Sequence, residues 1–128
     1  MDFSFPKRER IVSRKLIDGL FSKQGSQSSV AFPIRAVWKE VPASSPGSPV
    51  SAQILISVPK RHFKHAVDRN RIKRQIREAY RNHKDLLSGR LADSRQLAIA
   101  FIWLSDRHLP SSDVEGRVVT LLKHVAAQ

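Results

Sequence analysis

Hydrophobic residues recur with a helical period near the start of the chain and in two later segments, and with a strand period in between. Ser13 can cap a short first helix, because one apolar stripe follows it at spacings of three and four: Ile17, Leu20 and Phe21. Gly25 and the polar residues after it end this helix. The basic residues 1–9 before it are expected to form a flexible tail.

The strand period comes next. Val30–Lys39 predicts a half-buried strand, because two sets of residues alternate along it: Val30, Phe32, Ile34, Ala36 and Trp38 on one face, and Ala31, Pro33, Arg35, Val37 and Lys39 on the other. Pro33 indicates an edge or a bulge, so a break into two strands is an alternative. Residues 41–51 are rich in serine and proline and predict a mobile loop. Residues 54–58 predict a further strand, and the apolar run Leu97–Leu104 is typical of a central strand covered on both faces.

The helical period returns from Ala66 to about Leu86, where one stripe is apolar: Ile72, Ile76, Ala79 and Tyr80. Ser112 followed by Glu115 is a capping-box pattern that opens a last helix with Val114, Val118, Leu121, Leu122 and Val125 inward. Trp38 and Trp103 are expected in the core. The order α-β-β-α-β-α, with a further strand if the first is broken, predicts an α+β fold: one domain of 128 residues, built as a small α-β sandwich.

Positive charge is concentrated in Lys60–Lys84. This segment holds ten lysines and arginines against two acids, a net +8 out of +12 for the whole chain. Charge of one sign at this density repels itself unless a polyanion binds it, and phosphates are the expected partner. The alternative is a solvated helix face, but such faces usually interleave both signs at a spacing of four residues.

Several classes of protein fit the composition poorly. The chain has no cysteine, which excludes disulfides and thiolate zinc sites. The N-terminus lacks the apolar core of a signal peptide, and no apolar run is long enough to span a bilayer, so a cytoplasmic protein with no membrane contact is expected. The carboxylates are scattered, and the histidines at 62, 65, 83, 108 and 124 lie in basic or helix-end contexts. A self-contained nuclease is therefore the less favoured reading.

Residues 58–81 resemble the signature of the protein subunit of bacterial ribonuclease P. A strand ends in the basic pair Lys60-Arg61, and one helix then carries Arg69-Asn70-Arg71, Lys73-Arg74, Arg77-Glu78 and Tyr80-Arg81. The likeness in element order extends over roughly residues 8–125. The sequence departs from the family pattern at Pro59, where a small residue is usual, and at Ile17, where phenylalanine is frequent. The loop at 41–51 also looks particular to this branch.

The resemblance implies a compact α-β sandwich with a left-handed β-α-β crossover, of the ribosomal protein S5 domain 2-like type. It implies two partners, the large catalytic RNA of ribonuclease P and precursor tRNA, whose 5′ leader the ribonucleoprotein removes; no protein partner is required. The chemistry would belong to the RNA and to Mg²⁺ ions held mainly by the RNA and the substrate.

The same resemblance assigns site residues. The surface that binds the catalytic RNA would comprise Arg69, Asn70, Arg71, Lys73, Arg74, Arg77 and Arg81 on the helix, with Lys60, Arg61 and Lys64 before it. The groove that takes the single-stranded leader would have Lys60 at its edge and a floor of Ile17, Phe21, Ile34 and Ala36. An ordinary core position is the alternative for Phe21, and a local structural role is the alternative for Asn70.

Two other functional classes share the charge. Another RNA-binding module, such as a ribosome-associated or RNA-assembly protein, would be equally basic but does not account for the ordered Arg-Asn-Arg helix. A DNA-binding domain would be expected to carry a helix-turn-helix pair, and no short turn places a second helix next to residues 66–86.

Overall fold

A computed structural model describes residues 26–41, 52–87 and 96–127. Its elements, in chain order, are β1 (Gln27–Ala31), β2 (Ile34–Val41), β3 (Ala52–Ser57), α2 (Ala66–His83), the 3₁₀ helix η2 (Lys84–Leu87), β4 (Gln96–Trp103) and α3 (Ser111–Ala127). The expected tail and first helix lie outside the described residues. So does the expected loop at 41–51, apart from Val41, which ends β2.

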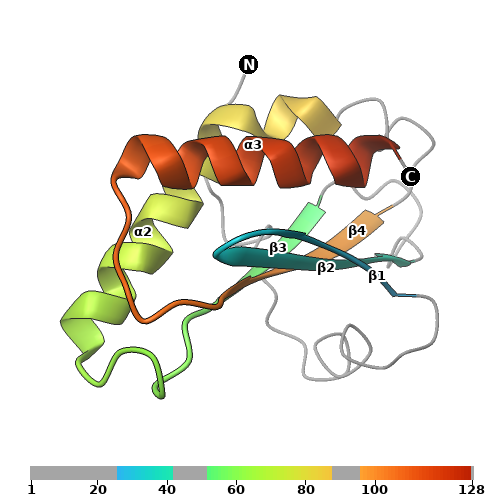
Figure 1. The fold of residues 1–128 in the computed structure, drawn as a ribbon. Helices are drawn as coiled ribbons and strands as arrows, with labels where there is room; N and C mark the ends of the chain where they lie inside the picture. The colour runs from blue at the N-terminus through green and yellow to red at the C-terminus, as the bar shows by residue number, and fades with distance from the viewer. Residues whose placement is uncertain (1–25, 42–51, 88–95, 128) are drawn as a thin grey trace.

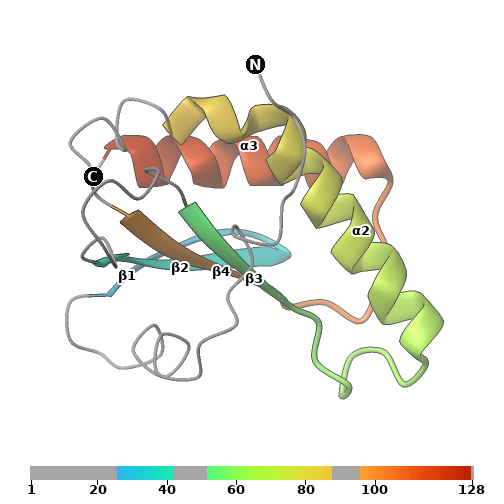
Figure 2. The same cartoon turned by 180° about the vertical axis from the view of Figure 1, so that it is seen from behind.

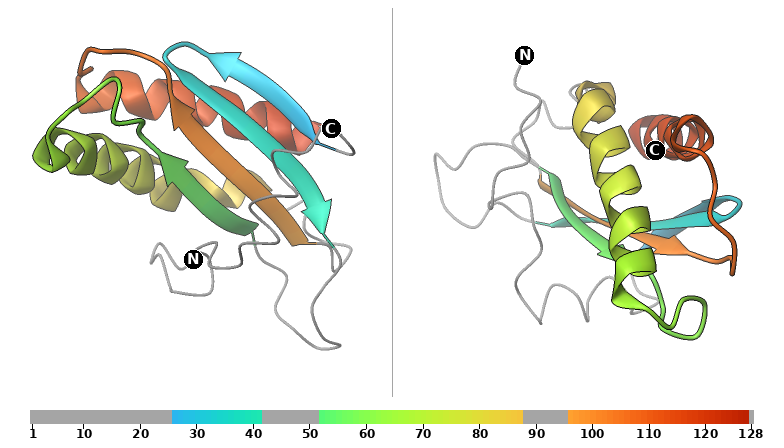
Figure 3. Two further views of the ribbon diagram at one scale, coloured as in Figure 1. Left: turned by 90° about the horizontal axis from the view of Figure 1, so that it is seen from below. Right: turned by 90° about the vertical axis from the view of Figure 1, so that its left-hand side faces the viewer.

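The four strands form one mixed sheet in the order β1-β2-β4-β3. β1 and β4 are antiparallel to β2, whereas β3 and β4 are parallel. Helices α2 and α3 lie together on one face of this sheet (Figures 1 and 2). In Figure 3, left, these helices lie behind the sheet, and β4 lies to the right of β3 when both arrows point up. The β3-α2-β4 crossover is therefore left-handed, and the expected α+β sandwich is confirmed.

The core lies between the sheet and the two helices. Ile34, Ala36 and Trp38 point from β2 into this layer, because every second residue of a strand faces the same side. The apolar stripes expected on the two helices are buried as well: Ile72, Ile76, Ala79 and Tyr80 of α2, and Val114, Val118, Leu121, Leu122 and Val125 of α3. Trp38 and Trp103 are core residues, as predicted.

The segment expected as one strand at 30–39 is a hairpin. Phe32 and Pro33 make the turn between β1 and β2, and Ala31 pairs with Ile34 across it. The alternative of a broken strand is thus confirmed, and a single strand that places Val30 and Phe32 on one face with Ile34 is wrong. Reversal at the turn puts Val30 opposite Arg35 rather than in line with Ile34, so Val30 is 53% exposed and Phe32 is 64% exposed.

The last helix begins two residues earlier than its capping box predicts. The carbonyl of Pro110 accepts the backbone N–H groups of Asp113 (3.0 Å) and Val114 (3.1 Å), so Pro110 occupies the cap position. Ser112 then lies in the first turn of α3, not at the cap. The predicted capping box is wrong for this reason, although the helix itself is confirmed.

Candidate nucleic-acid interface

The buried stripe of α2 fixes which of its side chains face outward. Ile72 and Ile76 point into the core, so the residues on the opposite side of the helix face solvent. Asn70, Arg71 and Arg74 are exposed there. The remaining cations, Lys73, Arg77 and Arg81, are half-buried along one flank of the same face. We call this surface, from residue 70 to residue 81, the cationic face of α2.

The exposed acid on this face is paired. Glu78 accepts a hydrogen bond from the Arg81 guanidinium, with 2.6 Å between Oε2 and the nitrogen, one helical turn away. A helix holds its side chains at fixed intervals, so the guanidinium groups are presented as an ordered row. Each guanidinium can bind a phosphate through two parallel hydrogen bonds.

The loop between β3 and α2 adds three more cations. Its turn is closed by the N–H groups of His62 (3.1 Å) and Phe63 (3.4 Å), which donate to the carbonyl of Pro59. The ring of Phe63 is buried in the core and anchors the loop. The basic side chains around this anchor remain exposed: Lys60, Arg61 and Lys64. The structure therefore places the loop cations next to the first turn of α2.

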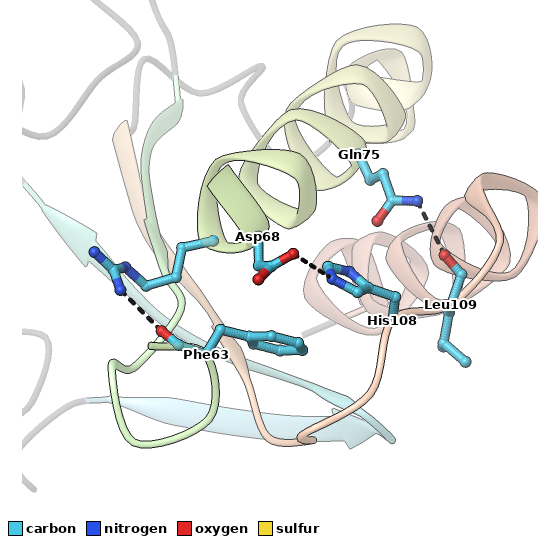
Figure 4. A network of polar contacts seen from close by, with 6 residues as sticks. Phe63, Asp68, Gln75, His108 and Leu109 are labelled. Carbon is cyan, nitrogen blue, oxygen red and sulfur yellow. Dashed lines mark hydrogen bonds and ion pairs between the residues drawn. The ribbon is translucent and has the colours of Figure 1, made fainter. Parts of the chain in front are cut away.

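Arg69 has a role that sequence reasoning missed. One nitrogen of its guanidinium donates to the carbonyl of Phe63 at 2.8 Å, a bond drawn as the dashed line at Phe63 in Figure 4. The same nitrogen donates to the carbonyl of Lys64 at 3.0 Å, and Arg69 is half-buried. Arg69 thus joins α2 to the loop that precedes it. The pattern of charges predicts only an RNA contact for Arg69. Nothing in it indicates a hydrogen bond to a backbone carbonyl six positions earlier.

The opposite flank of α2 is joined to the segment between β4 and α3. Asp68 Oδ1 lies 3.2 Å from His108 Nε2 (Figure 4). The centroid of the His108 ring lies 4.7 Å from the centroid of the Phe63 ring. Gln75 Nε2 donates to the carbonyl of Leu109 at 3.0 Å. These contacts fix the orientation of α2 and leave its cationic face turned outward.

Two more histidines extend this pattern. His62 Nδ1 lies 2.5 Å from Asp106 Oδ1, and His83 Nε2 lies 2.7 Å from Glu115 Oε1. Sequence reasoning favoured phosphate contacts or plain solvation for these imidazoles. Within the described residues they instead connect the α2 region to residues 106–115. Their partners are more than 30 positions away in the sequence, so a local pattern could not reveal them.

The structure contradicts two residues of the expected leader groove. Ile34 and Ala36 are 0% exposed and lie in the core beneath the helices, so they present no surface to a ligand. The strand turns the intervening residues to the other face of the sheet: Arg35 is exposed there, and Lys39 is half-buried. The alternation of side chains predicts correctly which residues of a strand share a face, but it does not indicate which of the two faces binds a ligand.

The other two residues of the expected groove floor, Ile17 and Phe21, lie outside the described residues. Lys60, the expected groove edge, is exposed just past the end of β3. Among the described residues, histidines and carboxylates form no group of three that would hold a metal ion. No helix in the described part of the chain is both long and apolar enough to cross a membrane.

A small α-β sandwich with a cationic helix and a cationic loop held on one side defines a nucleic-acid-binding α+β protein. Comparison with known proteins identifies the family. The sequence model of the family described as ribonuclease P matches residues 5–125, so the chain belongs to the ribonuclease P protein family.

Relatives agree along most of their length. The ribonuclease P protein component of Porphyromonas gingivalis is 37% identical over 105 residues, which cover 81% of this chain and 73% of the relative. The ribonuclease P protein component of Chlorobium phaeobacteroides is 31% identical over an alignment of 132 residues, which covers 94% of this chain and 86% of the relative.

Solved structures support the fold. The ribonuclease P protein of Thermotoga maritima superposes with a TM-score of 0.67 at 19% identity, covering 91% of this chain and 97% of that chain. A Staphylococcus aureus ribonuclease P protein, a mutant with defective mRNA degradation activity, gives a TM-score of 0.68 at 21% identity, covering 93% and 89%.

The double role of Arg69 leads to a prediction. Arg69→Ala should lower the free energy of unfolding by about 1–2 kcal/mol, because two carbonyls lose a charged donor at a partly solvated site. It should also weaken RNA binding, because the loop that bears Lys60 and Arg61 is released. Thermal unfolding and RNA affinity measure the two effects. Arg71→Ala removes the same charge from an exposed position and should leave the melting temperature unchanged; equal melting temperatures in both variants would contradict the structural role.

Proposed function

We propose that this protein is the protein component of a ribonuclease P ribonucleoprotein, which binds the catalytic RNA and the 5′ leader of precursor tRNA and so assists removal of the leader. The observation that carries the proposal is the cationic face of α2. Its arginines face outward while Arg69, Asp68 and Gln75 hold the helix to the rest of the protein. We place this activity in the cytoplasm, with no further protein partner required.

Electrostatics favours RNA as the partner of α2. Each phosphate that a lysine or arginine neutralises releases condensed counterions, which makes binding tight at low salt and weaker as salt rises. The helix supplies several such contacts at once with side chains whose spacing is already set. Asn70 lies between two arginines and offers both a donor and an acceptor, so it can bond a base edge or the backbone.

We assign catalysis to the RNA subunit. The described residues bring no three carboxylates or imidazoles together, and four acids are paired with basic side chains: Asp68, Glu78, Asp106 and Glu115. This donor set does not suit Mg²⁺, which prefers free carboxylate oxygens. We therefore place the Mg²⁺ ions on the RNA and the substrate. The contribution of the protein is to bind and position, and its cations replace part of the ionic screening that RNA needs.

For the leader, we propose the face of the sheet opposite the helices. Arg35, which is exposed, and Lys39, which is half-buried, lie on that face of β2, and the half-buried Ile102 is the cross-strand neighbour of Arg35 on β4. A single strand is held by cations that track its backbone and by apolar surface beneath its bases, without regard to sequence. In this assignment Arg35 and Lys39, which alternate with Ile34 and Ala36 along β2, take the place of those two residues in the leader-binding surface.

Reconstitution tests the proposal. Cleavage of precursor tRNA is measured at low Mg²⁺ with the catalytic RNA alone, the protein alone and both together. We expect no cleavage by the protein alone, and faster cleavage by the complex than by the RNA alone. Cleavage by the RNA-free protein that a single histidine or aspartate substitution abolishes would overturn the assignment of catalysis. Binding of the RNA with no gain in cleavage would favour a general RNA-binding module instead.

A further inference from the structure

The tip of the β1–β2 hairpin exposes an aromatic ring that the proposed function does not use. Phe32 is 64% exposed, whereas the other aromatic rings in the described strands, Trp38, Phe101 and Trp103, are almost completely buried. A phenylalanine that faces water forgoes the free energy its burial would provide. Most exposed apolar residues need no explanation, so the surroundings of Phe32 decide whether it has a function.

The backbone on either side of this ring is held in place. The Phe32 carbonyl accepts a hydrogen bond from Arg117 Nε of α3 at 3.0 Å, and the Pro33 carbonyl accepts one from the Leu104 N–H at 2.8 Å. The tip is therefore tied to α3 and to the end of β4 rather than projecting freely. A ring on a fixed backbone loses less conformational entropy when a ligand stacks on it.

Three arginines belong to the segments that meet at the hairpin tip. Arg117 reaches the tip from α3, Arg35 lies three residues along β2, and Arg107 lies in the connection that bonds to Pro33; all three are exposed. The acids at this end include Asp106, which is paired with His62, Asp68, which is paired with His108, and Asp113 in the first turn of α3. The hairpin tip and the connections β3–α2 and β4–α3 gather at one end of the sheet (Figure 3, left). The loop cations Lys60 and Arg61 thus belong to the same end of the molecule.

We propose that Phe32 is a stacking platform for an unpaired RNA base, whose flanking phosphates are held by Arg117, Arg35 and Arg107. The proposal rests on the proposed function and adds a contact point across the sheet from α2. An exposed aromatic among arginines fits a single-stranded nucleic acid, because every base has a face that stacks and every nucleotide carries a phosphate. An apolar protein partner fits less well, because it would offer no anionic group to the guanidinium groups of the three arginines.

Two sources could supply the base: the catalytic RNA and the 5′ leader of precursor tRNA. Equilibrium affinity is measured for Phe32→Ala, first with the catalytic RNA and then, in the assembled complex, with precursor and mature tRNA. We expect about a tenfold loss for one of these RNAs, which corresponds to one stacked base. A loss for the catalytic RNA identifies that source, and a loss for precursor but not mature tRNA identifies the leader. The salt dependence should keep its slope, because no charge is removed.

Three further variants make the result specific. Phe32→Trp should bind at least as tightly as the native protein, and its exposed indole should be quenched when RNA binds. Phe32→Leu keeps an apolar side chain and should bind like Phe32→Ala. Val30→Ala removes an exposed apolar group from the same hairpin and should change affinity less than twofold. All four variants should retain the native melting temperature, because these side chains lie outside the core.

Two results would overturn the platform. One is affinity of Phe32→Ala for every RNA within twofold of the native value, with cleavage of precursor tRNA still assisted; the proposed function then stands without it. The other is full affinity of Phe32→Leu, which would mean that an apolar contact, not stacking, operates at the tip. Failure of the native protein to bind either RNA would instead refute the proposed function.

Discussion

Replacing Arg71 and Arg74 together by alanine should weaken binding of the catalytic RNA about 100-fold. Both guanidinium groups are exposed on the cationic face of α2, and a charge-assisted hydrogen bond contributes about 1.5–3 kcal/mol. The salt dependence should change with it: the slope of log K against log salt should become shallower by about 1.5 to 2, because two phosphate contacts are lost. Affinity measured over a series of salt concentrations reports both quantities.

A matched control separates this effect from simple loss of charge. Lys123→Ala removes an exposed cation from α3 and should alter affinity and slope little. All the variants should unfold at the native temperature, since none of these side chains belongs to the core. A loss with Lys123→Ala as large as that with Arg71→Ala would mean that the partner reads net charge rather than the cationic face of α2.

Ile34→Ala should destabilise the protein by about 2–5 kcal/mol, because a fully buried side chain leaves a cavity between the sheet and the helices. For a chain of 128 residues we expect a fall in melting temperature of roughly 3–5 °C for each kcal/mol. At temperatures where the variant remains folded, its affinities for precursor and mature tRNA should keep their native ratio. Thermal unfolding and the two affinities are the measurements.

The neighbouring residue on the strand provides the comparison. Arg35 points to the other face of the sheet, so Arg35→Ala should lower the free energy of unfolding little. The same change should weaken the binding of precursor tRNA more than the binding of mature tRNA. An unchanged melting temperature in Ile34→Ala together with a selective loss for precursor tRNA would restore Ile34 to the leader groove and refute our choice of face.

Most of the fold follows from short-range patterns. The stripe of Ile72, Ile76 and Tyr80 predicts both the helix and the side it buries, and hence the side on which the arginines face outward. The uninterrupted apolar run around Phe101 likewise predicts a central strand, and β4 is paired on both sides. These features depend on residues close together in the sequence, so a single chain is sufficient to reveal them.

The errors arise where a distant or a competing interaction decides. At Phe32-Pro33 the alternation continues through a chain reversal, and the pattern alone cannot separate one long strand from a hairpin. At Ser112 the capping pattern is present, but the carbonyl of Pro110 already serves the first N–H groups of the helix. Arg69 bonds to backbone carbonyls of the preceding loop, and His62 and His83 bond to acids more than 30 positions away; a pattern of charges encodes neither kind of contact.

The central claim is that the outer face of α2 lies against RNA, and site-specific crosslinking tests it most directly. The chain has no cysteine, so one introduced thiol carries a photoreactive group at a single known position. Val67→Cys places it on α2, where the native side chain is 78% exposed one turn from Arg71; Thr120→Cys places it on the exposed side of α3. Neither change removes a cation. We predict strong crosslinking to the catalytic RNA from position 67 and little from position 120; equal yields, or a higher yield from position 120, would contradict the account.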